Sequence, residues 1–342
     1  ISSAISQWFP ASDGQEGGSI QCLTKRGSFI FAGTYGGNIY YTTNSGSKWE
    51  YRGLGNKGYF VTALASDGIN IYAGSDSGIY KSTNDGANWF SINNGLTDKN
   101  VLSLLIKGSI VFAGTAGQSV FKSTDGGNSW TSVSNGITAG SPVRALALRG
   151  TDIFAGTSLN GIFRSTNDGL NWTSVSSGLP SGGYVYSLLS RGDYLFASYE
   201  VNGIYKSTNN GLNWSASNSG FPSGVTVYKV YNYDTVLYAG TYSQGLYRSV
   251  NNGINWVSVN SGGTIGESFY DIINNGTTLY AGSNNSGVFT SNFPGVNWTS
   301  INSGLTNQYI FCMGASITNV YTGTSQGVFT TSNNGNNWVK DN

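Results

Sequence analysis

The chain has 342 residues and a net charge of +1, with 17 Lys and Arg against 16 Asp and Glu scattered along it, and it contains no histidine. Scattered charge disfavours a nucleic-acid surface, and the lack of histidine removes the commonest general base and the commonest metal ligand. Two cysteines can hold neither a metal cluster nor a disulfide framework, and no run approaches the ~20 apolar residues of a membrane-spanning helix, so we expect no cofactor, no metal and no direct membrane insertion.

Residues 1–18 form the first predicted element, an N-terminal strand that closes or flanks the last structural repeat. Trp8 precedes Trp49 by 41 residues, so residues 5–12 are in phase with the outermost strand of a repeat. Either this segment or residues 338–342 supplies the outer strand of the last repeat, and the sequence leaves both arrangements open.

Tryptophans at intervals of 40–42 residues then divide the chain into eight repeats, and such a period is typical of propeller blades. The tryptophans are Trp49, Trp89, Trp130, Trp172, Trp214, Trp256, Trp298 and Trp338. The repeats span approximately 19–58, 59–99, 100–141, 142–183, 184–225, 226–267, 268–308 and 309–342. Each contains four short runs rich in Val, Ile, Tyr and Phe between Gly, Asn and Asp turns, which predicts four strands.

The third turn of most repeats carries a specific motif, as in STNDGANW at residues 82–89 and STNNGLNW at residues 207–214. This motif resembles the Asp-box, or BNR repeat, of sialidases, sortilin-type receptors, xyloglucanases and photosystem II assembly-factor propellers. In it an Asp or Asn oxygen caps the turn, Gly takes a positive φ and Trp covers the hairpin. Asp125 keeps the acid of the family, whereas the seventh box contains Phe293 and Pro294, so we expect its turn to be distorted. The structural residues of the boxes are Asp125, Trp89, Trp130, Trp172, Trp214 and Trp256.

The predicted fold is therefore all-β: residues 1–342 form a single eight-bladed β-propeller domain of four-stranded antiparallel blades with an Asp-box hairpin in each repeat. Closure into a ring leaves only short, protected sheet edges. One equivalent position of the first strand holds Cys22 and Cys312 in the first and last repeats, and Lys229 and Asp271 in neighbouring repeats. We expect an ion pair between Lys229 and Asp271, and Cys22 close to Cys312. The two cysteines are either a disulfide or two small buried thiols.

Ligands of Asp-box relatives usually bind the face away from the boxes, and the resemblance implies the same here. The candidates are an aromatic arc on the first strands together with residues of the loops on that face. They are Tyr186, Tyr228, Tyr270, Phe311, Arg144, Tyr199, Glu200, Tyr242, Glu267 and Tyr309. The aromatic arc either stacks on a sugar or an extended peptide, or only packs one blade on the next.

The sequence disfavours an enzyme. Sialidases of the resembled family need three converging arginines, and most of the seven arginines here occupy repeat positions away from the ligand face. Another glycoside hydrolase would need two paired carboxylates, for which Glu200 and Glu267 are the best pair. We therefore expect a non-catalytic binding or scaffolding propeller. A protein partner is favoured because the loops differ between repeats, with a lectin-like carbohydrate module as the alternative. Few charges with abundant Asn, Ser, Thr and Gly resemble bacterial secreted and surface proteins, so we expect a secreted or cell-surface location.

Overall fold

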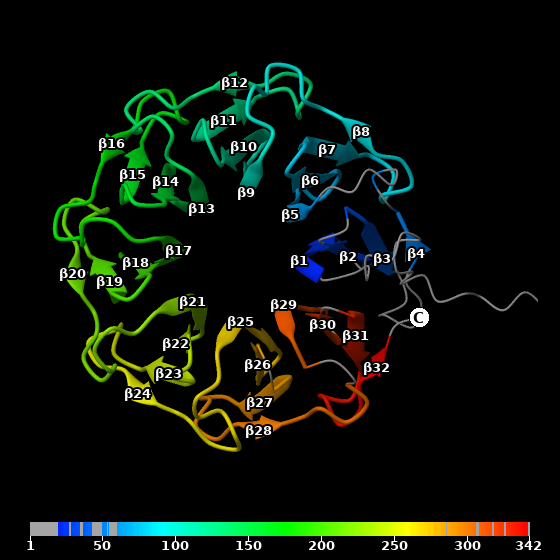
Figure 1. The fold of residues 1–342 in the computed structure, drawn as a ribbon, viewed down its shortest axis with the longest axis vertical. Helices are drawn as coiled ribbons and strands as arrows, with labels where there is room; N and C mark the ends of the chain where they lie inside the picture. Colours follow the sequence, from blue (N-terminus) through cyan, green and yellow to red (C-terminus); the bar gives the residue numbers. More distant parts are fainter. Residues whose placement is uncertain are drawn as a thin grey trace, which may run out of the picture. The chain divides into compact units, whose positions relative to one another are not determined.

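The computed structural model describes residues 20–26, 29–34, 37–42, 50–52, 54, 60–284, 286–305, 308–316, 318–324 and 326–340. The described residues form eight four-stranded antiparallel sheets and no helix (Figure 1). In every sheet the four strands pair in chain order. We call the sheets blades 1–8 in chain order. The predicted strand of residues 1–18 lies outside the described residues.

The chain divides into two compact units, residues 1–92 with 270–342 and residues 93–269. The blades of the first unit comprise β1 (Ile20–Arg26), β2 (Phe29–Thr34), β3 (Ile39–Thr42) and β4 (Glu50–Tyr51); β5 (Val61–Ser66), β6 (Ile71–Ser75), β7 (Gly78–Ser82) and β8 (Phe90–Ser91); β25 (Phe269–Asn275), β26 (Thr278–Ser283), β27 (Val288–Asn292) and β28 (Thr299–Ser300); and β29 (Ile310–Ala315), β30 (Val320–Thr324), β31 (Gly327–Thr331) and β32 (Val339–Lys340).

The blades of the second unit comprise β9 (Val101–Lys107), β10 (Ile110–Thr115), β11 (Val120–Ser123) and β12 (Thr131–Ser132); β13 (Val143–Arg149), β14 (Asp152–Thr157), β15 (Ile162–Ser165) and β16 (Thr173–Ser174); β17 (Val185–Arg191), β18 (Tyr194–Tyr199), β19 (Gly203–Ser207) and β20 (Ser215–Ala216); and β21 (Val227–Tyr233), β22 (Val236–Thr241), β23 (Leu246–Ser249) and β24 (Val257–Ser258).

Within each unit, apolar residues on both faces of the second strands bury a blade against its neighbours in that unit. In the first unit Tyr280 of blade 7 packs with Phe329 of blade 8, and Ala32 of blade 1 packs with Tyr321 of blade 8. Blade 1 in turn shares a core with Val61 of blade 2. In the second unit three further clusters join blades 3 and 4, 4 and 5, and 5 and 6. The first and last blades of the chain are therefore packed neighbours, as the prediction for the cysteines requires.

Cys22 and Cys312 form no disulfide, so the disulfide alternative is not the one in this structure. The Cys22 thiol donates to the backbone oxygen of Val61 in blade 2 at 3.7 Å, and burial raises its pKa to about 12. Cys312 packs against Ala32 of blade 1. Asp271, at the equivalent position of blade 7, accepts a hydrogen bond from the Met313 N–H of blade 8 at 3.0 Å. A Lys229–Asp271 ion pair would join the two units and stays a prediction.

The Asp-box turn is present in six of the described blades and has one hydrogen-bond pattern. In blade 5 the Ser207 hydroxyl bonds the Asn209 side chain and accepts from the Gly211 N–H, while Asn209 Oδ1 accepts from the Asn213 N–H at 2.9 Å. Blades 2, 3, 4, 6 and 8 repeat these bonds with Asn84, Asp125, Asn167, Asn251 and Asn333. Asn replaces Asp without loss because only one side-chain oxygen caps the turn.

The predicted fold class needs correction, because it assumed an Asp-box hairpin in every repeat. The seventh repeat has no Asp-box turn: its Phe293–Pro294 peptide is cis, and the Ser291 hydroxyl bonds the neighbouring Asn292 backbone oxygen. Phe293 stands where Asn209 stands in blade 5 and has no side-chain oxygen, so the usual cap cannot form. The Gly295 N–H donates instead to the Asn292 backbone oxygen at 2.8 Å. The box of blade 1 lies outside the described residues.

Asp125 allows a test of the box chemistry. Hydrogen bonds from the Ser129 hydroxyl, the Ser129 N–H and the Ser123 hydroxyl lower the pKa of this carboxyl from 3.8 to about 2. Because the folded-state pKa is depressed, the stabilisation is present above pH 4 and is lost as the pH falls toward 2. We expect Asp125→Asn to leave the melting temperature at pH 7 nearly unchanged and to reduce its loss between pH 4 and pH 2, as measured by calorimetry. An identical acid profile for the two proteins would contradict this assignment.

The box tryptophans connect neighbouring blades. The sequence predicted only that each tryptophan covers its own hairpin, so it missed this role. The Trp214 indole N–H donates to the Val175 oxygen of the preceding blade at 2.6 Å, and its backbone N–H donates to the Ser177 oxygen at 2.8 Å. Trp172 repeats both bonds with blade 3. These two tryptophans therefore fix their own hairpins against the segment that follows the outer strand of the blade before them.

Candidate functional site

A β-bulge on the first strand places three of the predicted site residues. The pairing of β17 with β18 passes from Val185 to Ser187 without Tyr186, and the same shift omits Arg144 from β13 and Tyr228 from β21. A bulge leaves one residue outside the hydrogen-bonded pairing of the two strands and redirects its side chain. Arg144, Tyr186 and Tyr228 are thus freed from strand pairing in three successive blades.

Four tyrosine rings follow one another across blades 5 and 6, and Arg144 of blade 4 contacts the first of them. We call Tyr184, Tyr186, Tyr228 and Tyr242 the tyrosine ladder. The Arg144 guanidinium lies over the Tyr184 ring, 5.4 Å from its centroid, and its Nε donates to the Ser158 hydroxyl at 3.1 Å. The following ring centroids are separated by 6.2 Å between Tyr184 and Tyr186, 5.2 Å between Tyr186 and Tyr228, and 6.1 Å between Tyr228 and Tyr242. The last two pairs are T-shaped, so ring faces and edges alternate along the ladder.

Three of the ladder tyrosines border a cavity of about 570 Å³ between blades 5 and 6. The lining residues come from the first strands, from the turns between second and third strands, and from the loop that joins the two blades. They are Tyr186, Glu200, Val201, Pro222, Ser223, Gly224, Val225, Thr226, Tyr228, Tyr242, Ser243 and Gln244. A cavity of this size suits a small ligand or the side chains of a bound segment.

The walls of the cavity are fixed by one hydrogen bond between the two blades and one within blade 6. The Thr226 hydroxyl accepts from the Val201 N–H at 2.9 Å, and the Thr226 oxygen accepts from the Tyr242 N–H at 2.9 Å. Val201 has a φ of 50°, which is rare for a β-branched residue, and its side chain is 57% exposed at the rim. Strained, exposed residues of this kind occur at ligand sites more often than elsewhere because surrounding contacts must hold them.

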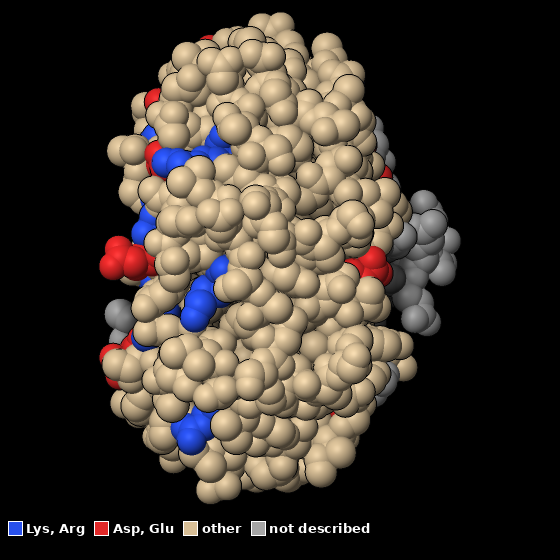
Figure 2. Space-filling view, turned by 90° about the vertical axis from the view of Figure 1, so that its left-hand side faces the viewer, with Lys and Arg blue, Asp and Glu red and all other residues tan. Residues whose placement is uncertain are grey.

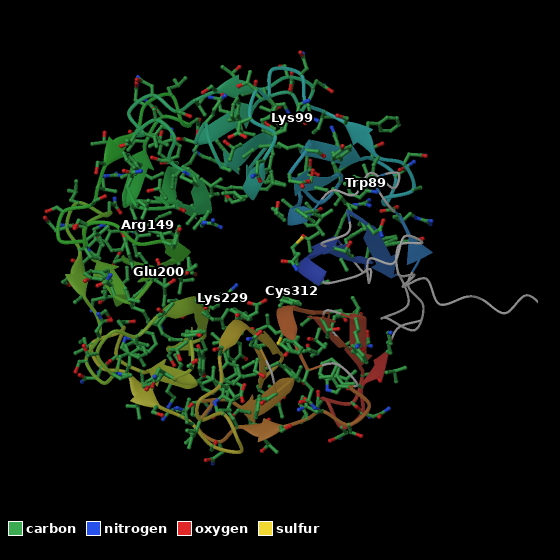
Figure 3. All side chains as sticks on the ribbon, viewed as in Figure 1. Trp89, Lys99, Arg149, Glu200, Lys229 and Cys312 are labelled. Carbon is green, nitrogen blue, oxygen red and sulfur yellow. The ribbon has the colours of Figure 1, made fainter. Side chains whose placement is uncertain are left out.

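Glu200, which Figure 3 labels, is the only charged residue among those that line the cavity. Its carboxylate accepts from the Tyr186 hydroxyl at 3.5 Å. Burial raises the pKa of Tyr186, the Glu200 charge adds to this effect, and the Arg144 charge opposes it. The site therefore combines three tyrosines with one carboxylate.

The structure brings together half of the predicted ligand residues. Tyr186, Tyr228, Glu200 and Tyr242 line the cavity, and Arg144 joins the ladder through Tyr184. Tyr199 does not line it: this side chain is fully buried in the core between blades 4 and 5, in T-shaped contact with Tyr205.

The other predicted residues lie outside the cavity. The Glu267 backbone oxygen accepts from the Gly245 N–H, so this residue supports the neighbouring turn. Tyr270, Phe311 and Tyr309 belong to the other compact unit and line no part of this cavity.

Sequence reasoning missed the loop wall formed by residues 222–226. The loop contains Pro222 and Gly224, residue types that indicate only a turn, and in the structure Gly224 has a φ of 74°. Nothing in the sequence shows which of eight such loops borders a cavity, because that depends on the side chains of two neighbouring blades.

Among the described residues, no group of three or more acidic, histidine or cysteine side chains is arranged to hold a metal. Within the same part of the chain there is also no helix that could cross a membrane. On the side of the molecule drawn in Figure 2, acidic and basic side chains are few and intermixed.

The sequence matches no family model and no curated protein. Solved structures, in contrast, match over most of the chain. The computationally designed Ika8 protein aligns with a TM-score of 0.71 at 12% identity, over 92% of this chain and 96% of that one. The fold is a β-propeller. Because a designed protein shares it, the fold alone assigns no activity.

Two natural proteins are also among the matches. One is a xyloglucanase, a class that the Asp-box resemblance named, and the other is YCF48. A GH74 xyloglucanase from Xanthomonas campestris has a TM-score of 0.61 at 14% identity over 83% of this chain, and this chain spans about half, 54%, of that enzyme. YCF48 bound to a D1 peptide has a TM-score of 0.59 at 13% identity, over 77% of this chain and 88% of that one. At these identities the comparisons establish similarity of fold.

Proposed function

We propose that this chain is a non-catalytic binding propeller that acts outside the cell, and that it takes an extended segment of a protein partner along the tyrosine ladder into the cavity between blades 5 and 6. One observation carries the proposal: four tyrosines from two adjacent blades follow one another at 5.2–6.2 Å and end in a cavity. In an extended peptide, side chains on one face recur about every 6–7 Å. Successive side chains of such a segment can therefore each meet one ring.

The arrangement of the rings favours a peptide over a sugar. Sugar binding commonly uses a flat aromatic face, whereas the Tyr186–Tyr228 and Tyr228–Tyr242 pairs make angles of 72° and 82°. Alternating faces and edges form partial enclosures that suit individual side chains. YCF48, with the same fold, has been solved with a D1 peptide bound, which supports a peptide ligand for a propeller of this kind.

The cavity also offers little support for glycoside hydrolysis. That reaction needs two carboxyl groups about 5–9.5 Å apart on either side of the bond. Glu200 is the single carboxylate among the lining residues, and its predicted partner Glu267 does not line the cavity.

Selection of random peptides on the native protein, followed by affinity measurement, tests the proposal. We expect selected peptides to lose about tenfold or more in affinity for Tyr242→Ala, because truncation of a central aromatic contact costs upward of 1–2 kcal/mol. Tyr309→Ala is the matched control, since Tyr309 is 49% exposed and Tyr242 is 53% exposed, but Tyr309 lies outside the cavity.

The control should bind as the native protein does. Equal losses for both variants, or robust binding on a glycan array with no selected peptide, would contradict the proposed function.

A further inference from the structure

We infer that the cavity between blades 5 and 6 is a pocket for a cationic side chain, an arginine of the bound segment. The inference rests on the proposed function and specifies its anchor. The juxtaposition that carries it is Glu200 beside the Tyr186 hydroxyl, with Tyr228 and Tyr242 around the same space.

The residues that line the cavity carry one negative charge and no positive charge. Glu200 is half-buried and supplies the only charge among the lining residues, and no ion pair formed between described residues includes it. A carboxylate that is partly removed from water is stabilised by a cation that reaches it. Arg144, the nearby basic residue of the ladder, does not line the cavity; its guanidinium stacks on Tyr184 and bonds Ser158. A cation that pairs with Glu200 inside the cavity would therefore come from the ligand.

The rings favour a guanidinium. Tyrosine faces attract cations, and a planar guanidinium can stack on a ring while it donates two hydrogen bonds to a carboxylate. Between described residues a guanidinium already lies over a tyrosine ring, with Arg144 over Tyr184 at 5.4 Å and, in the other unit, Arg52 over Tyr41 at 4.4 Å. In the cavity the guanidinium would stack on the ring of Tyr228 and donate hydrogen bonds to the carboxylate of Glu200. The volume of about 570 Å³ exceeds that of one arginine side chain and leaves room for the adjoining backbone.

A pair of small probes separates charge from shape. Nα-acetyl-arginine amide carries the guanidinium, whereas Nα-acetyl-citrulline amide has nearly the same shape without charge. We expect the arginine probe to bind the native protein and the citrulline probe to bind roughly 10–100-fold more weakly, the range for one charge-assisted hydrogen-bonded pair. Titrations followed by NMR of the protein measure both affinities.

Two variants locate the effect. Glu200→Gln should bring the two probes to within about threefold of each other, and Tyr228→Leu should weaken the arginine probe. Asp193→Asn is the control, because Asp193 is a 97% exposed carboxylate on the turn at the opposite end of the same blade. This variant should keep the native preference for arginine.

The outcomes distinguish this inference from the proposed function. Equal affinity of the two probes for the native protein, or an unchanged preference in Glu200→Gln, overturns the cation pocket. If uncharged peptides still bind and still depend on Tyr242, the proposed function survives that result. If neither probe nor any selected peptide binds, both proposals fall.

Discussion

Gly178→Ala should destabilise the protein by about 2–6 kcal/mol, the combined cost of a strained φ and of overpacking. Gly178 has a φ of +84°, and a Cβ there would lie 2.0 Å from the backbone oxygen of Trp214 in the next blade. Neither atom can move freely, because the Trp214 N–H is bonded to Ser177 beside this glycine. Urea denaturation of the purified variant measures the loss.

Gly182→Ala, four residues along the same loop, is the matched control. Gly182 also has a positive φ, +74°, but a Cβ there would meet nothing within 4 Å. Only the cost of a left-handed backbone remains, about 1–2 kcal/mol. If the two variants lost the same stability, the close approach of neighbouring blades would not be the reason for glycine at position 178. The same contact recurs at Gly95, Gly136, Gly220 and Gly304.

Trp214→Ala should cost about 3–5 kcal/mol, as expected for removal of a large buried aromatic side chain. The side chain is 5% exposed and lies in the core between blades 4 and 5, and its indole bond to Val175 is lost as well. Thermal denaturation and urea titration both report this change. Because the indole connects two blades, we also expect the m-value to fall if the blades no longer unfold together.

Leu212→Ala provides the comparison within the same Asp-box. Leu212 is 56% exposed, so its truncation should change the free energy of unfolding by no more than about 0.5 kcal/mol. A loss similar to that of Trp214→Ala would show that the box turn itself, rather than the contact between blades, determines stability.

The repeat made the blades predictable from sequence. The interval between tryptophans, together with short apolar runs separated by Gly and Asn turns, gave four antiparallel strands per blade, and the structure confirms this arrangement. The Asp-box motif also predicted the capping role of Asn209 and its equivalents, because an Asx turn depends on residues within eight positions of each other. The proline of the seventh box signalled the turn that departs from the pattern.

The aromatic arc was predicted in part. Alignment on the tryptophans placed Tyr186 and Tyr228 at one position, but it could not show that a bulge releases them from strand pairing. It also treated Tyr199 as a loop residue, whereas Tyr199 is the last residue of β18, and the side chains on both faces of this strand are buried. A strand covered on both faces by neighbouring sheets buries its residues whichever face they lie on.

Local sequence thus determined the blade, its turns and the residues of its first strand, because these follow from backbone propensities and from hydrogen bonds between near neighbours. Contacts between blades decided the rest. The tryptophan that reaches the preceding blade, the glycine that faces its backbone oxygen, and the cavity around Glu200 all depend on residues from two different blades. Packing between neighbouring sheets brings such residues together, and no local pattern encodes which of several equivalent junctions will leave a cavity.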